Sequence, residues 1–212
     1  MLNQKYDRAL VLAPHTDDGE LGAGGTIARL VASQTHVSYV AFSSADESLS
    51  PNWPPDTLRK EVAAATAQLG IAPADLFVLD YRVRHLHERR QEILEYLIAL
   101  RDEFAPQLVL MPSATDLHQD HEVVAKEGLR AFKHTTILSY EIPWNHLDFR
   151  ASGFVELTPE DLDKKIRAME CYESQKHRSY VNAEYLRAQA RFRGVQAGTT
   201  YAEVFDVVRW IY

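Results

Sequence analysis

Residues 8–33 read RALVLAPHTDDGELGAGGTIARLVAS and join a short apolar run, a polar turn and a helical pattern. The run at residues 8–13 has the continuous apolar character of a strand buried on both faces, and residues 24–33 have the pattern of a helix. Because a buried strand followed closely by a helix is the repeating unit of a parallel sheet, this stretch predicts an α/β fold.

The same alternation continues through the first two thirds of the chain. Further strands are predicted at residues 36–43, 76–80, 108–111 and 137–141, and further helices at residues 56–69, 88–104 and 122–132. The final third is less regular, with helices predicted at residues 159–173 and 183–191 and a closing strand or strand–helix piece at residues 200–211. No repeat or linker divides the chain. We therefore expect one domain over residues 1–212, a Rossmann-like three-layer sandwich with a mostly parallel sheet.

Composition excludes several classes of protein. The chain has 212 residues, a formal net charge of −7 and one cysteine, Cys171. The negative charge argues against a nucleic-acid partner, and no apolar run approaches the ~18 residues that a membrane span needs. A lone cysteine forms no internal disulfide, and residues 1–8 lack an apolar signal core. We expect a cytoplasmic protein without membrane partners; whether it forms a homo-oligomer stays open.

A cluster of polar residues follows the first predicted strand. His15, Asp17 and Asp18 lie within five positions of Ala13, and functional sites in such folds lie beyond the carboxyl ends of the strands. His15 and Asp18 could bind one cation, and Asp17 could accept a proton from water. This donor set suits Zn²⁺, and Fe²⁺ or Co²⁺ could also use it. Alternatively, these residues cap the next helix or satisfy the turn.

A second cluster, Asp116-Leu117-His118-Gln119-Asp120-His121, follows the fourth predicted strand. It lies at the same edge of the predicted sheet, so it can face the first cluster. His121 can complete a metal set with His15 and Asp18, and three protein ligands plus water is the usual arrangement of catalytic zinc. His118 is then left over, with Asp120 two positions further on, and a histidine beside a carboxylate can stabilise charge or donate a proton.

The two clusters together resemble the LmbE-like, or PIG-L, family of zinc-dependent N-deacetylases. The family pattern is (P/A)HPDDE after a strand and HxDH later; here APHTDDGELGAGGT stands at residues 13–26 and HQDH at residues 118–121. Arg59-Lys60-Glu61 and residues 194–205 (GVQAGTTYAEVF) also fit. Thr16 departs from the common proline, and Gly19 stands where glutamate is frequent, with Glu20 one position later.

The resemblance implies a role for each matching residue. His15, Asp18 and His121 match the metal ligands, and Asp17 matches the catalytic base. His118 matches the group that stabilises the oxyanion or protonates the leaving amine, with Asp120 as its partner.

Three residues are weaker candidates for substrate binding. Arg59 matches a substrate-contacting arginine of the family, and Glu47 lies in the acidic loop after the second strand. Arg84 belongs to a basic run at residues 82–90 that could bind a phosphate or carboxylate, or form a solvated helix entry. Trp53 and Trp144, in proline-containing loops, could stack on a sugar or form small satellite contacts.

The expected function is that of a metal-dependent N-deacetylase. By resemblance, a metal-activated water removes acetyl from an N-acetylated amino sugar, such as N-acetylglucosamine, or from another sugar-containing small molecule. One alternative is a non-catalytic metal- or sugar-nucleotide-binding protein of the same fold. Another is a nucleotide-dependent Rossmann enzyme that uses the glycine-rich residues 19–25, although their spacing differs from G-x-G-x-x-G.

Overall fold

The molecule is built on one twisted seven-stranded sheet with the strand order β3-β2-β1-β4-β5-β7-β6. The computed structural model describes residues 5–211. The strands are β1 (Arg8–His15), β2 (His36–Ser43), β3 (Leu76–Val78), β4 (Leu108–Pro112), β5 (Thr136–Tyr140), β6 (Gly153–Leu157) and β7 (Tyr201–Arg209). Strands β1 to β5 are parallel, whereas β7 runs antiparallel to both β5 and β6. The expected mostly parallel α/β fold is confirmed.

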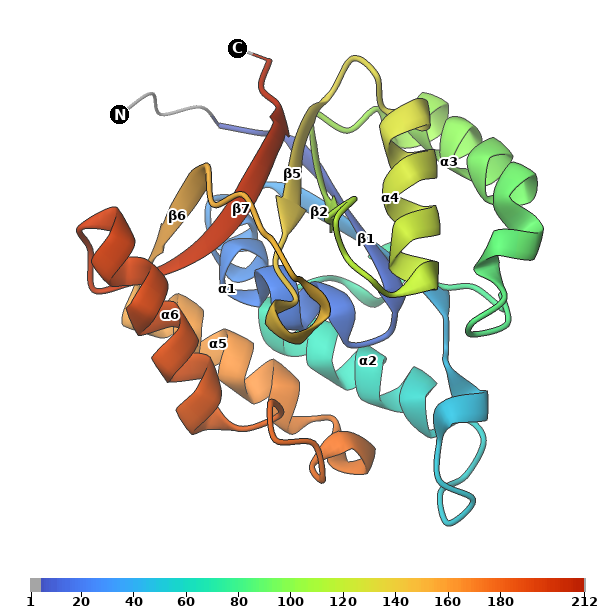
Figure 1. The fold of residues 1–212 in the computed structure, drawn as a ribbon, viewed down its shortest axis with the longest axis horizontal. Coiled ribbons are helices and arrows are strands. Elements are labelled where there is room, and N and C mark those ends of the chain that lie inside the picture. Colours follow the sequence, from blue (N-terminus) through green and yellow to red (C-terminus); the bar gives the residue numbers. More distant parts are fainter. Residues whose placement is uncertain (1–4, 212) are drawn as a thin grey trace.

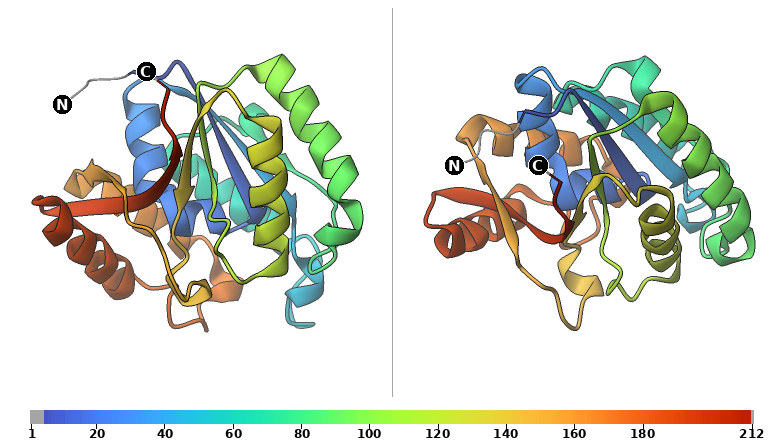
Figure 2. Two further views of the ribbon diagram at one scale, coloured as in Figure 1. Left: turned by 45° about the horizontal axis from the view of Figure 1, so that its top comes forward. Right: turned by 90° about the horizontal axis from the view of Figure 1, so that it is seen from above.

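Helices cover both faces of the sheet (Figures 1 and 2). They are α1 (Asp18–Ala32), α2 (Thr57–Leu69), α3 (Arg90–Phe104), α4 (Gln119–Ala131), α5 (Pro159–Glu170) and α6 (Ala183–Ala197). The side chains of β1 alternate between two cores: Val11 belongs to the core that includes residues of α1, α2 and α5, and Leu12 to the core that includes residues of α3 and α4. No described helix is both long and apolar enough to cross a bilayer.

The order of the strands creates a switch point between β1 and β4. From β1 the chain moves outward through β2 and β3, and then returns to add β4 and β5 on the other side of β1. The loops after β1 and β4 therefore leave the sheet side by side at its carboxyl edge. Such a crevice is where ligands bind in open α/β sheets.

Several predicted boundaries differ from the structure. Helix α1 begins at Asp18 rather than at residue 24, so the glycine-rich stretch is helical. A Cβ on Gly22 would lie 2.3 Å from the ring of Tyr140, so this position needs glycine because the helix lies directly against β5. Strand β6 was not predicted, α5 ends at Glu170, and α6 continues to Ala197.

Candidate metal centre

Two loops that are far apart in the sequence meet at the carboxyl edge of the sheet. His15 is the last residue of β1, and Asp18 is the first residue of α1. His118 caps the N-terminus of α4 and accepts a hydrogen bond from the backbone N–H of Asp120. Strands β1 and β4 are paired neighbours, so both short strand-to-helix turns bring their polar residues to one place.

Three donor atoms have the spacing of a metal site. His15 Nδ1 and His121 Nε2 each lie 3.1 Å from Asp18 Oδ2, and they lie 3.4 Å from each other. Donors bound tetrahedrally at ~2.0–2.2 Å from zinc are about 3.3 to 3.6 Å apart. The two histidines and Asp18 therefore fit one ion with little movement.

The second nitrogen of each histidine contacts a buried carboxylate. His15 Nε2 lies 2.9 Å from Asp120 Oδ2, and His121 Nδ1 lies 2.7 Å from Asp116 Oδ2. Such carboxylates fix the orientation of metal-binding histidines and make them better ligands. Sequence reasoning missed this role of Asp116, although the residue opens the second cluster.

The position of Asp120 corrects one expectation. Its carboxylate was expected beside His118, but it contacts His15 and the backbone N–H groups of Arg84 (2.6 Å) and Leu86 (3.3 Å). Only the backbone N–H of Asp120 reaches His118, at 3.2 Å from Nδ1. The first turn of α4 thus directs the carboxylate toward β1.

Charges in the centre favour a cation. Burial alone would lower the pKa of His15, but hydrogen bonds to Asp120 and Asp18 raise it to about 9. Burial also opposes protonation of His121, whose pKa is raised to about 10 by Asp18 and Asp116. Burial would raise the pKa of Asp18, yet His121 and His15 hold it far below its usual range. Carboxylates that hold protons on these rings would equally hold a divalent ion, which displaces those protons.

His118 lies beside the three donors. Its ring centroid is 4.8 Å from that of His15 and 4.7 Å from that of His121. Nitrogens of these three histidines lie within 4.8 Å of one another, which makes His118 an alternative ligand. The shorter distances to Asp18 favour Asp18 as the third ligand. Burial, with the nearby His121 and His15, lowers the pKa of His118 to about 4, so its ring is neutral at pH 7.

Asp17 faces the same cavity as these residues. Burial and the charge of Asp18 raise its pKa to about 6. At neutral pH the carboxylate is therefore mostly ionised and still basic enough to take a proton, which suits a general base.

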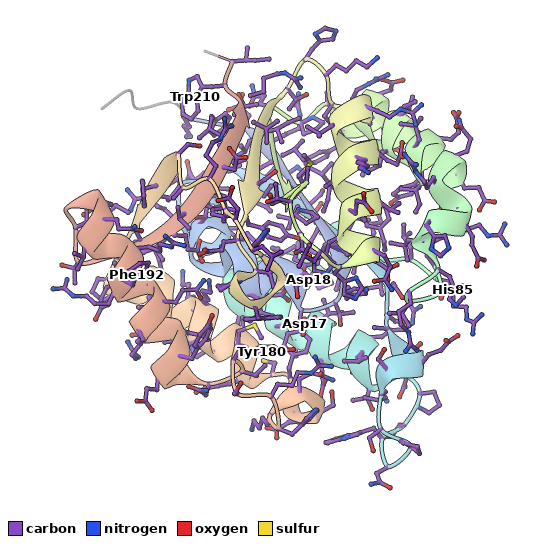
Figure 3. The ribbon with its side chains drawn as sticks, in the orientation of Figure 1. Asp17, Asp18, His85, Tyr180, Phe192 and Trp210 are labelled. Atoms are coloured by element: carbon purple, nitrogen blue, oxygen red, sulfur yellow. The ribbon has the colours of Figure 1, made fainter. Side chains whose placement is uncertain are left out.

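A cavity of about 350 Å³ opens over the centre. One wall is aromatic: the rings of Trp144 and Tyr180 stack with centroids 3.7 Å apart and planes 16° apart. Tyr180 lines the same cavity as Asp17 and Asp18 from a different segment of the chain, and all three are labelled in Figure 3. Arg178 also lines the cavity. Trp144 was a candidate from its sequence context, whereas no sequence signal singled out Arg178 or Tyr180.

The three predicted substrate-binding residues lie outside this lining. Arg59 donates to the carbonyl of Val78 and to the carboxylate of Asp80. Glu47 pairs with Arg82 at 2.7 Å and approaches Arg84 to 4.0 Å. Arg59 is thus engaged with β3 and Asp80, and Glu47 with Arg82 and Arg84, so a role of these residues in substrate binding stays a prediction.

Glu20 supports the turn that carries the site. Its buried carboxyl group is hydrogen-bonded to the hydroxyls of Tyr39 and Tyr172. Both hydroxyls also lie within hydrogen-bond distance of the Thr16 carbonyl, at 3.0 Å and 2.6 Å. A Cβ at Gly19 would lie 2.6 Å from Tyr39. The Gly19–Glu20 departure noted in the sequence therefore has a structural reason.

Comparisons with known proteins agree with this fold and identify relatives of the chain. The family model for PIG-L, described as GlcNAc-PI de-N-acetylase, matches residues 10–132, more than half of the chain. The diacetylchitobiose deacetylase of Thermococcus kodakarensis is 26% identical over 229 residues, which cover 97% of this chain and 84% of that protein.

Solved structures share the whole fold. A conserved protein of Thermus thermophilus superposes with a TM-score of 0.80 at 25% identity, covering 98% of this chain and 97% of that one. The 4-carboxy-2-hydroxymuconate hydratase of Pseudomonas putida superposes with a TM-score of 0.76 at 24% identity, covering 97% and 98% of the two chains.

These matches define the class of protein. The chain belongs to the PIG-L family. It is a hydrolase of that family, and its relatives include N-deacetylases.

Proposed function

We propose that this protein is a zinc-dependent deacetylase that releases acetate from an N-acetylated amino sugar. The observation that carries the proposal is the tetrahedral spacing of His15, Asp18 and His121 beside an ionisable Asp17 in one cavity. The family and the diacetylchitobiose deacetylase relative supply the substrate class.

His15, Asp18 and His121 would hold the ion. When bound, zinc supplies Lewis acidity and lowers the pKa of water toward ~7. Asp120 and Asp116 keep the two imidazoles oriented with one nitrogen of each toward the ion.

Asp17 would take the proton of the attacking water at its carboxylate. His118 accepts from the Asp120 backbone through Nδ1, so its neutral ring carries the proton on Nε2. That N–H could donate to the acetamide oxygen as negative charge develops there. The amide C–N bond then breaks, giving acetate and a free amine, and Asp17 or His118 returns the proton to the nitrogen.

Replacing the base tests the proposal. The zinc-loaded Asp17→Asn variant should bind metal like the wild type and release acetate from diacetylchitobiose about 10² to 10⁴ times more slowly. Metal per chain by mass spectrometry and acetate release measure the two effects. Asp163→Asn is the matched control, because this partly exposed side chain of α5 pairs with Arg187 and lies outside the cavity lining. Near-normal turnover in Asp17→Asn would show that another group is the base.

The same measurements distinguish a deacetylase from a non-catalytic binding protein of the same fold. A wild-type protein that binds one zinc per chain but releases acetate from no amino sugar would favour a non-catalytic binding protein. The hydratase among the structural neighbours belongs to a different reaction class, so the fold alone does not define the reaction.

A further inference from the structure

Arg178 lies on a loop that is fixed beside the metal centre. The loop follows α5, and Glu61 of α2 anchors it by accepting hydrogen bonds from the backbone N–H of Ser174 (2.8 Å) and from its hydroxyl (2.7 Å). Arg178 lines the same cavity as Asp17, and it is the only lysine or arginine among the described residues that do so.

The charge of Arg178 has no carboxylate partner. No carboxylate oxygen of the described residues lies within 4.0 Å of its guanidinium nitrogens. One N–H group, at Nη1, donates to the Tyr180 hydroxyl, whereas Nε is buried without any hydrogen-bond partner in the described chain. In contrast, Arg193 of α6 is bound to Glu141 and Arg59 to Asp80.

An unpaired, partly buried guanidinium beside a cavity has the chemistry to bind an anion. Its planar set of N–H groups matches a carboxylate or phosphate, which it can bind through two parallel hydrogen bonds. The stacked pair of Trp144 and Tyr180 stands next to it. Trp144 is 42% exposed, and an exposed aromatic ring suits the apolar face of a sugar.

We propose that Arg178 selects substrates in which the amino sugar carries an anionic group, a carboxylate or a phosphate. This inference rests on the proposed function, because the amino sugar is the substrate class proposed above. Beyond the proposed function, the inference specifies that the substrate is negatively charged and that Arg178 binds this charge.

A competing role for Arg178 is to act on Asp17 alone. The two charges interact across the cavity. Loss of Arg178 would then change kcat equally for neutral and anionic sugars and would leave their binding unchanged. Binding and turnover therefore distinguish the two roles.

Sugars that cannot be deacetylated isolate the binding step. We would measure Kd by calorimetry for glucose, glucose 6-phosphate and glucuronate on the zinc-loaded wild type, Arg178→Gln and Lys176→Gln. Lys176 stands two positions away on the same loop, is exposed and pairs with Glu173. Because it lies outside the cavity lining, Lys176→Gln is a control that removes one positive charge without changing the cavity. The phosphate and the carboxylate sugar show which anion is preferred.

The expected result is a preference for an anionic sugar that depends on Arg178. The wild type should bind one anionic sugar at least about tenfold more tightly than glucose, since hydrogen bonds to charged groups give roughly tenfold to hundredfold. Arg178→Gln should lose most of this preference, and Lys176→Gln should stay within about twofold of the wild type. Equal binding of all three sugars by the wild type would overturn the proposal. A preference that survives in Arg178→Gln would also overturn it, because a group other than Arg178 would then bind the anion.

Turnover keeps the two proposals separate. N-acetylglucosamine and its 6-phosphate are compared as substrates of the same three proteins. Acetate release without an anion preference overturns the role of Arg178 and leaves deacetylation standing. An Arg178-dependent preference without acetate release refutes the deacetylase and leaves the anion site.

Discussion

The hydrogen bonds around buried Glu20 indicate that its carboxyl group is protonated. The hydroxyls of Tyr39 and Tyr172 have one proton each to donate. Together they contact three oxygens, the Thr16 carbonyl and both oxygens of Glu20, so two protons are too few to bridge all of them. A protonated Glu20 supplies the missing donor. Burial agrees, since it raises the pKa of Glu20 to about 8 from its ordinary value of 4.5, against the two tyrosine hydrogen bonds.

Glu20→Gln should therefore change how stability depends on pH. Between pH 4.5 and 8 the unfolded Glu20 is ionised and the folded one keeps its proton. The folded state then binds one more proton, so the free energy of unfolding falls as pH rises, by up to about 1.4 kcal/mol per pH unit. Glutamine is neutral throughout, so the variant should gain stability relative to the wild type across this window. Urea unfolding at several pH values measures the difference, with exposed Glu160→Gln as the control; parallel curves for Glu20→Gln and wild type would contradict it.

Residues were predictable where a short motif fixes both their chemistry and their place. The two clusters each follow a buried strand, so the meeting of His15, Asp18 and His121 follows from the order of elements. Arg178 and Tyr180 reach the cavity from an irregular segment, which is placed there by the anchoring of Ser174 by Glu61 and by the stacking of Tyr180 on Trp144. Such long-range contacts leave no local pattern.

Helix α1 shows how an element can depend on a distant strand. In a regular helix the Gly25 N–H donates to the Leu21 carbonyl. Here the carboxylate of Glu203, on β7, accepts from the N–H groups of Gly25 (2.9 Å) and Thr26 (2.6 Å). Lys165 of α5 donates to the Leu21 carbonyl (2.7 Å) and pairs with Glu203 at 2.6 Å. This buried ion pair joins α1, α5 and β7.

Removing one member of the pair should be costly. Glu203→Ala leaves Lys165 charged, buried and unpaired, and it leaves two helix N–H groups without their acceptor. Losing one partner of a buried pair costs about 3 to 5 kcal/mol. Chemical denaturation measures the loss, and Glu156→Ala on the exposed side of β6 is the control. A change below ~1 kcal/mol would mean that water reaches Lys165 freely.

The elements that were not predicted from the sequence also depend on contacts with distant parts of the chain. The glycines of α1 indicate a loop, but they permit close packing of the helix against Tyr140. Strand β6 is an edge strand with alternating exposure, and its pairing with β7 defines it. The buried strands β1, β2, β4 and β5 were predicted to within two residues at each end, because continuous apolar runs are a local signal.

At the scale of the whole molecule, the candidate metal ligands come from both halves of the sheet. His15 and Asp18 belong to the first strand–helix unit, and His121 belongs to a unit that starts beyond the switch point. Without an ion, these groups are held only by hydrogen bonds and ion pairs. An ion bound by all three would link the ends of β1 and β4 in the folded state alone.

Zinc should therefore stabilise the entire fold. A ligand present at 100 times its Kd adds about 2.7 kcal/mol to the free energy of unfolding, and each 1 kcal/mol raises the Tm of a chain of this size by about 2 to 4 °C. Adding zinc to chelator-treated protein should raise Tm by roughly 5 to 10 °C. His121→Ala should lose this rise, whereas His36→Ala, which removes an exposed partner of Asp75 at the start of β2, should keep it. Scanning calorimetry with and without zinc measures the shifts. An equal rise in His121→Ala would place the stabilising ion elsewhere, and the junction between the two halves would then rest on protein contacts alone.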